Sequence, residues 1–360
     1  MKNLSRFKGS RAVWTALLAA LVVAVAAAAA GILAERGNAA PAAKSGQAPY
    51  PPRAAKFKRP KLKQGVLIIQ GSRASDKITL RLQAGQPDVL QVDVGDDGSA
   101  DFSIARSRIA KIAVSAGSGN DLVRIDEGNG AFTDTIPTAI AGGDGNDTLA
   151  GGKGVETLLG GNGNDSIDGN GGNDRALLGA GEDTFVWDPG DGSDTVEGQD
   201  GTDTMLFNGA NVAEQVQLSA NGSRLKFFRT QANITMDTAG VERVDFNALG
   251  GADLVTVNDL SGTDVTSVNV DLAGTLGGVS GDGQPDRVVV NATNGDDAIN
   301  VNGDAGGVKE SGLAAGVKIL HSDAANDRLE INTLDGRDSV DSSGLAAGAI
   351  QLFVDGLLVP

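Results

Sequence analysis

The stretch that decides the fold runs from residue 142 to residue 186 and reads, in blocks of nine, GGDGNDTLA, GGKGVETLL, GGNGNDSID, GNGGNDRAL and LGAGEDTFV. Most blocks have early glycines, an acid at the sixth place and an apolar residue at the eighth. A fixed period of this kind is typical of a repeat architecture. The sixth places are Asp147, Glu156, Asp165, Asp174 and Asp183, and the eighth places are Leu149, Leu158, Ile167, Ala176 and Phe185. After a two-residue insertion the pattern resumes around Asp194 and then Asp203.

The spacing predicts stacked coils. Glycine tolerates positive φ, so the first six residues of a block can form a tight turn, and the last three can form a short strand whose middle side chain enters the core. Two blocks then close one coil of about eighteen residues, and coils stack at roughly the 4.8 Å spacing of neighbouring strands. Stacking predicts two columns of carboxylates, one with Asp147, Asp165 and Asp183 and the other with Glu156, Asp174 and Asp194.

Stacked carboxylates need a cation between them. Two such charges about 5 Å apart repel by roughly 3 kcal/mol at an effective dielectric constant near 20. A flexible cage of carboxylate and carbonyl oxygens suits Ca²⁺ better than Mg²⁺, which requires a strict octahedron. A flexible linker rich in Gly and Asp is the alternative interpretation, but it does not explain the apolar residue at every eighth place.

The blocks resemble the G-G-x-G-x-D-x-U-x nonapeptide of the RTX (haemolysin-type) calcium-binding proteins. The resemblance covers about 65 residues and implies a parallel β-roll with Ca²⁺ bound between successive turns. The second block departs from the pattern at Lys153, Val155 and Glu156, and the fourth departs at Asn170 and Ala176. We therefore rank the column of Asp147, Asp165 and Asp183 first. The remaining candidate ligands, through side chains or glycine carbonyls, are Asp174, Asp194, Asp203, Glu156, Asp144, Asn146, Asn162, Asn164, Gly143, Gly145, Gly152, Gly154, Gly161, Gly163, Gly172 and Gly181.

Charge is divided unequally along the chain. Residues 1–64 carry twelve Lys/Arg and one Glu, whereas the remainder carries eighteen Lys/Arg and forty-five Asp/Glu. A body this acidic is not expected to bind nucleic acid, and it gains from bound cations. The chain contains no cysteine, which excludes disulfides, thiolate metal sites and thiol catalysis. Bound Ca²⁺ would then take the stabilising role that disulfides have in many exported proteins.

The N-terminus has the features of an export segment. Four basic residues precede an apolar run over 12–34, which is long enough to span a bilayer as a helix. Small residues near Ala40 favour a cleaved signal peptide, whereas the length of the run favours a retained anchor, so residues 1–40 are one or the other. Residues 41–64 are predicted to be a basic Pro/Ala-rich linker. Its cations could contact anionic cell-wall polymers or lipid headgroups, although a solvated spacer is the simpler interpretation.

Strand patterns flank the repeats on both sides. In residues 65–141 apolar residues alternate with polar ones, and an acidic turn over 93–101 partly resembles a calcium loop but lacks the final Glu. In residues 207–360 a longer repeat begins at Glu242, Asp286 and Asp327. A weaker copy of it, in the N-terminal flank, begins at Ala110. These copies end in G-x-D-x-U turns, which we expect to bind Ca²⁺ weakly or not at all. Asn221-Gly222 predicts a hairpin.

The predicted fold class is all-β: an elongated parallel β-roll or β-solenoid with an N-terminal hydrophobic helix. Its domains are 1–40, 41–64, 65–141, the calcium-binding roll 142–206, and degenerate solenoid repeats over 207–360. No catalytic motif was found, and the lone His321 follows an apolar strand pattern. We therefore predict an exported, non-enzymatic calcium-binding protein at the cell surface or outside the cell, which meets the membrane only through its N-terminal segment. A surface adhesin or matrix protein and a polysaccharide-active β-helix enzyme are the alternatives.

Overall fold

The protein is described by a computed structural model covering residues 57–359. The predicted signal or anchor segment, its helix and most of the basic linker lie outside these residues. Within the described part every regular element is a strand, apart from the short 3₁₀ turns η2 (Arg106–Arg108) and η3 (Gln231–Asn233). No helix in residues 57–359 has the length and apolar character needed to cross a membrane. The chain divides into two compact units, residues 1–166 and 167–360.

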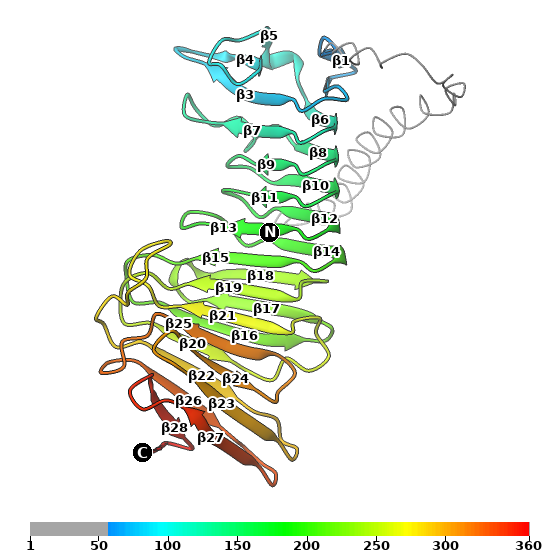
Figure 1. Ribbon diagram of the computed structural model, residues 1–360. Coiled ribbons are helices and arrows are strands. Elements are labelled where there is room, and N and C mark those ends of the chain that lie inside the picture. The colour runs from blue at the N-terminus through cyan, green and yellow to red at the C-terminus, as the bar shows by residue number, and fades with distance from the viewer. Residues whose placement is uncertain (1–56, 360) are drawn as a thin grey trace, which may run out of the picture. The chain divides into compact units, whose positions relative to one another are not determined.

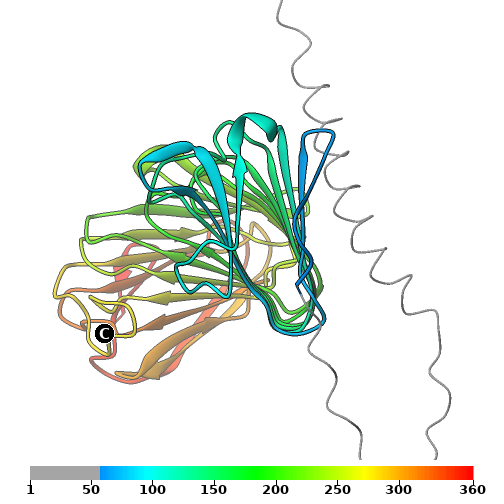
Figure 2. The same cartoon turned by 90° about the horizontal axis from the view of Figure 1, so that it is seen from above.

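Unit 1 is built from two facing sheets, here called A and B (Figures 1 and 2). Sheet A contains, in spatial order, β1 (Lys61–Lys63), β2 (Val66–Gln70), β6 (Lys111–Ser118), β8 (Thr138–Asp144) and β10 (Glu156–Asn162). Sheet B contains β9 (Thr148–Ala150), β7 (Leu122–Asp126), β3 (Lys77–Gln83), β4 (Gln86–Val94) and β5 (Phe102–Ala105). Strands β2, β6, β8 and β10 pair in parallel, as do β3, β7 and β9, so the chain alternates between the sheets as a solenoid does.

The first strands of unit 1 are antiparallel. Strand β1 pairs with β2, so the sheet begins at Lys61, inside the stretch predicted to be a linker. On the other side, β3, β4 and β5 form a meander. Lysines on a short first strand limit edge-to-edge association, because each addition to that edge would bury a charge.

Unit 2 has the same two-sheet organisation. Strand β11 (Ser166–Asp168) lies at the boundary between the units. Its sheet A contains β12 (Arg175–Gly181), β14 (Thr195–Gly201), β18 (Ile234–Ala239), β17 (Arg224–Arg229), β16 (Gln215–Asn221), β20 (Leu254–Val257), β22 (Arg287–Asn291), β26 (Arg328–Asn332), β28 (Gln351–Val354) and β29 (Leu357–Leu358). Its sheet B contains β13 (Thr184–Trp187), β15 (Thr204–Asn208), β19 (Arg243–Asn247), β21 (Ser267–Asp271), β25 (Gly316–Leu320), β24 (Gly307–Ser311), β23 (Ala298–Asp304) and β27 (Ser339–Leu345).

Two antiparallel meanders interrupt the parallel coils of unit 2. Strands β16, β17 and β18 form the first, and the predicted hairpin is confirmed, because Asn221 pairs with Arg224 across a turn in which Gly222 has a φ of 66°. Strands β23, β24 and β25 form the second. Parallel pairing continues on both sides of each meander, as between β14 and β18 and between β16 and β20.

The core follows the eighth places of the repeat. Leu149, Leu158, Ile167, Ala176 and Phe185 are all fully buried. Each large apolar side chain removed from water in this way contributes about 1.5–3 kcal/mol. In unit 2 the core becomes aromatic, where the Trp187 and Phe207 rings stack with centroids 3.9 Å apart and Phe227 and Phe246 pack beside them. The all-β parallel fold predicted from the sequence is therefore confirmed.

Candidate metal centre

The glycine-rich turns of unit 1 stack with their backbones in close contact. The glycines at four of these places have φ between 122° and 127°, a region that residues other than glycine rarely adopt: Gly143, Gly145, Gly161 and Gly163. A Cβ atom added to Gly161 would lie 2.1 Å from the carbonyl oxygen of Gly143, and one added to Gly163 would lie 2.3 Å from that of Gly145. Glycine is thus required at these places both for the turn and for the approach of the next coil.

The sixth-place carboxylates form ladders along the stacked turns. In unit 1 the backbone N–H of Asp147 donates to Asp165 Oδ1 at 2.7 Å. In unit 2 the N–H of Asp174 donates to Asp194 Oδ1 at 2.7 Å, and that of Asp183 donates to Asp203 Oδ1 at 3.0 Å. The structure therefore brings together Asp147 with Asp165, and Asp174 with Asp194, as the eighteen-residue coil predicted. It also adds Asp203 to the column of Asp183, because the two-residue insertion only lengthens that coil.

In three of these carboxyl groups the second oxygen is buried without a donor. Asp147, Asp194 and Asp203 are at most 2% exposed, and their Oδ2 atoms receive no hydrogen bond from any residue in the described range. Burial raises the pKa of Asp147 and of Asp194 to about 7 and that of Asp203 to about 6, and the charges of nearby acids add to the shift. For Asp147 these acids are Asp165 and Asp144. A cation bound beside these groups would favour their ionised form and lower their pKa values again.

Polar side chains line the outer rim of the same turns. The N–H of Asn164 donates to Asn146 Oδ1 at 3.0 Å, and Asn162 Nδ2 donates to Asp144 Oδ1 at 2.9 Å. These four predicted residues therefore tie adjacent turns together from the side. Within residues 57–359 no group of three or more His, Cys, Asp or Glu side chains is arranged to hold a metal. A cation in these turns would need backbone carbonyls as well as carboxylates, and oxygen ligands of both kinds fit Ca²⁺.

The second nonapeptide differs in structure as it does in sequence. Gly152 and Gly154 do not have positive φ, and Glu156 Oε2 accepts the N–H of Gly152 at 2.8 Å. The neighbouring segment is a loop closed by Glu127, which accepts the N–H groups of Phe132 and Lys153 at 2.7 and 2.9 Å. On this side of the coil the carboxylates of Glu156 and Glu127 thus accept hydrogen bonds from backbone N–H groups.

In unit 2 the predicted glycines approach the next turn even more closely. A Cβ added to Gly201 would lie 1.7 Å from the carbonyl oxygen of Gly181, and one added to Gly192 would lie 1.1 Å from that of Gly172. Gly172 and Gly181 have φ of 119° and 142°. The carbonyls of these two glycines therefore face the following turn, as those of Gly143 and Gly145 do in unit 1.

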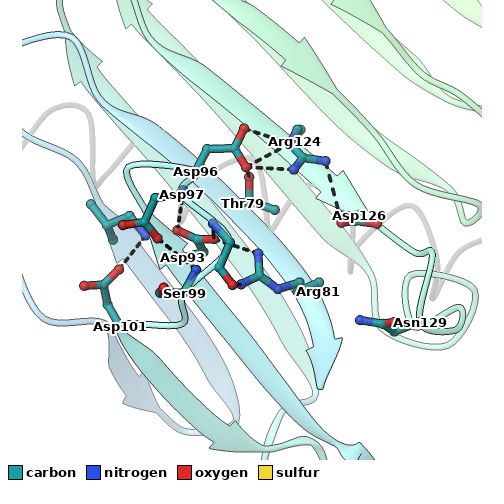
Figure 3. Close-up of polar contacts among 12 residues, drawn as sticks. Thr79, Arg81, Asp93, Asp96, Asp97, Ser99, Asp101, Arg124, Asp126 and Asn129 are labelled. Carbon is teal, nitrogen blue, oxygen red and sulfur yellow. Dashed lines mark hydrogen bonds and ion pairs between the residues drawn. The ribbon is translucent and has the colours of Figure 1, made fainter. Parts of the chain in front are cut away.

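The carboxylates of the acidic turn over 93–101 have protein partners (Figure 3). Asp93 is fully buried and accepts Arg81 Nη1 at 2.7 Å and the N–H of Gly98 at 3.0 Å. Asp101 accepts the N–H of Val94 at 2.7 Å, and Asp96 pairs with Arg124. Its resemblance to a calcium loop is thus explained by a structural ion pair.

The family model for the RTX calcium-binding nonapeptide repeat (four copies) matches residues 139–155, 150–185 and 190–211. These residues are RTX calcium-binding repeats. The matched segments make up less than a quarter of the chain and contain the glycine turns and carboxylate ladders described above. The matched segments are therefore calcium-binding repeats of the RTX type, folded as a parallel β-roll. A comparison with curated proteins finds no match.

Several acids outside the repeats join the ladders although the nine-residue period does not reach them. The N–H of Asp203 donates to Glu242 at 2.8 Å, 39 residues away. A further ladder in unit 2 runs from Glu214 through Asp253 to Asp286, with N–H to carboxylate distances of 2.7 and 2.8 Å. Its first acid, Glu214, forms a buried ion pair with Arg229. In the sequence, Glu242 and Asp286 are the first residues of longer repeats and Asp253 lies in a G-x-D-x-U ending, whereas Glu214 belongs to no repeat.

Proposed function

We propose that the protein is exported, that it acts as a non-enzymatic calcium-binding module, and that Ca²⁺ drives the folding of its RTX segment. The observation that carries the proposal is the buried ladder of sixth-place carboxylates. Residues 142–206 place ionisable groups in the interior, one coil above another, and leave Oδ2 of Asp147, Asp194 and Asp203 without a donor.

Without a cation this arrangement raises the free energy of the folded state. Neighbouring carboxylates about 5 Å apart repel by roughly 3 kcal/mol. Each ordered residue loses about 1–2 kcal/mol of backbone entropy, and glycine loses the most. The strands between the turns are short, since β9 and β11 have three residues each, so they contribute little burial to offset these terms. Ordering of the turns and capture of Ca²⁺ are therefore a single coupled event.

The residues that would hold Ca²⁺ are the Asp carboxylates of two adjacent turns together with glycine carbonyls such as those of Gly143 and Gly145. Bound there, the ion would neutralise the facing carboxylates and join the two coils. Dissociation constants of about 10⁻⁴–10⁻³ M are usual for extracellular calcium modules, so such sites would fill outside a cell and stay empty in the cytosol. This concentration dependence supports export, as does the basic and apolar N-terminal sequence.

The test is circular dichroism of the full-length chain in EDTA, in 1 mM Mg²⁺ and in 1 mM Ca²⁺. The part of the strand signal that comes from residues 142–206 should be missing in EDTA and in Mg²⁺, and it should appear cooperatively with Ca²⁺ on top of the constant signal of the flanking strands. The Asp165→Asn variant removes a carboxylate from the ladder of unit 1 and should require more Ca²⁺ for the same signal. A full strand signal in EDTA, or equal recovery in Mg²⁺, would show that folding is not driven by calcium.

A further inference from the structure

A turn that lies before the matched repeats has the same conformation as the repeats themselves. Residues 116–121 read AGSGND, and Gly117 and Gly119 have φ of 121° and 114°. The equivalent glycines of the first nonapeptide, Gly143 and Gly145, have 123° and 122°. The family match begins only at residue 139, so this turn lies outside it.

The two turns contact each other as two nonapeptide turns do. A Cβ on Gly143 would lie 2.0 Å from the carbonyl oxygen of Gly117, and one on Gly145 would lie 2.2 Å from that of Gly119. The corresponding distances one coil further along the chain are 2.1 and 2.3 Å. The N–H of Gly119 donates to the carbonyl of Asp144 at 2.7 Å, which equals the distance from Gly145 to Asn162.

The polar side chains repeat the same ladders. The N–H of Asn146 donates to Asn120 Oδ1 at 3.0 Å, and the N–H of Asp121 donates to Asp147 Oδ1 at 2.8 Å. Asp121 is 3% exposed and Asp147 is 1% exposed. The Oδ2 atoms of both accept no hydrogen bond from the residues that the structure describes. Two buried carboxylate oxygens without donors thus accompany two glycine carbonyls that face the next turn.

We propose that the turns 116–121 and 142–147 form an additional Ca²⁺ site, with the carboxylates of Asp121 and Asp147 and the carbonyls of Gly117 and Gly119 as its oxygen donors. The column of sites would end here. In the preceding turn, Asp76 Oδ2 accepts the N–H of Ser72 at 2.5 Å, and Ser72 and Ala74 stand at the places of Gly117 and Gly119.

The turn does not fall on the nine-residue period, because the coil between Asp121 and Asp147 is 26 residues long; in the sequence it belongs to the weaker copy of the longer repeat that begins at Ala110. The extra residues form the loop closed by Glu127, on the side of the coil opposite to the proposed site. One further difference concerns the first place of the turn. Ala116 pairs in register with Gly142, and a Cβ on Gly142 would lie 2.2 Å from Asp147 Oδ2. Asp121 Oδ1 accepts the N–H of Asp76 at 2.6 Å, just as Asp147 Oδ1 accepts that of Asp121, but the Ala116 methyl group occupies space beside Asp121 Oδ2 that is open at Gly142. We therefore expect this site to bind Ca²⁺ more weakly than the central ones.

This inference rests on the proposed calcium function, and the experiment separates the two. Bound Ca²⁺ is counted by equilibrium dialysis of the full-length chain with ⁴⁵Ca²⁺ over the micromolar to millimolar range. The Asp121→Asn variant should lose one ion, which is the weakest-bound one. The Asp126→Asn variant removes the same charge from the other end of β7 and should lose none. Ala116→Gly, which opens space for the carboxylate, should lower the dissociation constant of the weakest ion several-fold.

Each outcome decides between the proposals. If Asp121→Asn keeps the wild-type count while Asp165→Asn loses ions, the additional site is wrong and the calcium function stands. If neither variant loses an ion, both are wrong. If the Asp121→Asn variant does not fold even in saturating Ca²⁺, the Ala116→Gly variant is the test. An unchanged dissociation constant of its weakest-bound ion would overturn the proposal.

Discussion

Replacing Gly161 by alanine should disrupt the roll through a single methyl group. Gly161 has a φ of 127°, and the added Cβ would lie 2.1 Å from the carbonyl oxygen of Gly143, whereas real Cβ contacts shorter than 3.0 Å essentially never occur. The turns would have to separate by about 1 Å. The hydrogen bond from Asp147 N–H to Asp165 Oδ1, now 2.7 Å, would then exceed hydrogen-bonding range. Backbone strain costs about 1–3 kcal/mol, and loss of a hydrogen bond to a charged group costs about 1.5–3 kcal/mol more.

The matched control is Gly222→Ala. Gly222 also has positive φ, at 66°, but no atom lies within 4 Å of an added Cβ. Its cost should be only about 1–2 kcal/mol. If folding is coupled to calcium, the cost of Gly161→Ala appears as an increase in the Ca²⁺ concentration at the midpoint of the circular dichroism titration. A cost of 3 kcal/mol corresponds to roughly a hundredfold increase if the transition takes up one ion, and to the nth root of that factor if n ions bind together. Equal midpoints for the two variants would refute the reasoning that coil contact at this glycine is needed for the calcium-bound fold.

Two further predictions follow from charge and burial. The pKa values of Asp147 and Asp194 are raised from 3.8 to about 7, so in the absence of calcium the folded state binds more protons than the unfolded state between these values. Acidification should therefore favour the calcium-free fold, so the strand signal in EDTA should rise from pH 8 to pH 5, while Ca²⁺ binding weakens. Circular dichroism in EDTA and dialysis with Ca²⁺ check the two halves, and a strand signal in EDTA that falls on acidification would contradict the first. Arg81→Met leaves the buried Asp93 carboxylate without its cation and should cost about 3–5 kcal/mol in urea unfolding at saturating Ca²⁺. Arg124→Met, at a more exposed pair, should cost at most about 1 kcal/mol, and similar costs for both would contradict the assignment.

The regular part of the fold could be predicted from the sequence because each coil there repeats the same local rule. Glycines at fixed places define the turns, and an apolar residue at the eighth place defines the face that is buried. Leu149, Leu158 and Phe185 are accordingly all fully buried. The pairing of Asp147 with Asp165 follows from the same period, because two blocks make one coil.

The rest of the fold depends on contacts between segments that the nine-residue repeat does not relate. Asp121 joins the ladder across 26 residues, since a loop of different length still returns the chain to the same sheet. The meander of β16–β18 depends on a turn and on two alternating strands that could equally have formed another coil. Arg229 and Glu214 form a buried pair only because the meander brings β17 beside the chain that precedes β16. Such long-range pairs have no local signature.

The meanders also bear on the order in which the chain acquires structure. A parallel pair such as Ala176 with Val196 closes a loop of twenty residues, whereas β16 and β17 meet across a tight turn. Loop-closure entropy grows with length, and hairpins form within about 1–10 μs. Strand β18 then offers its other edge to β14, which belongs to the repeats. We therefore expect the meander, with its low contact order, to form before the parallel coils, which can then be added to its edge one after another.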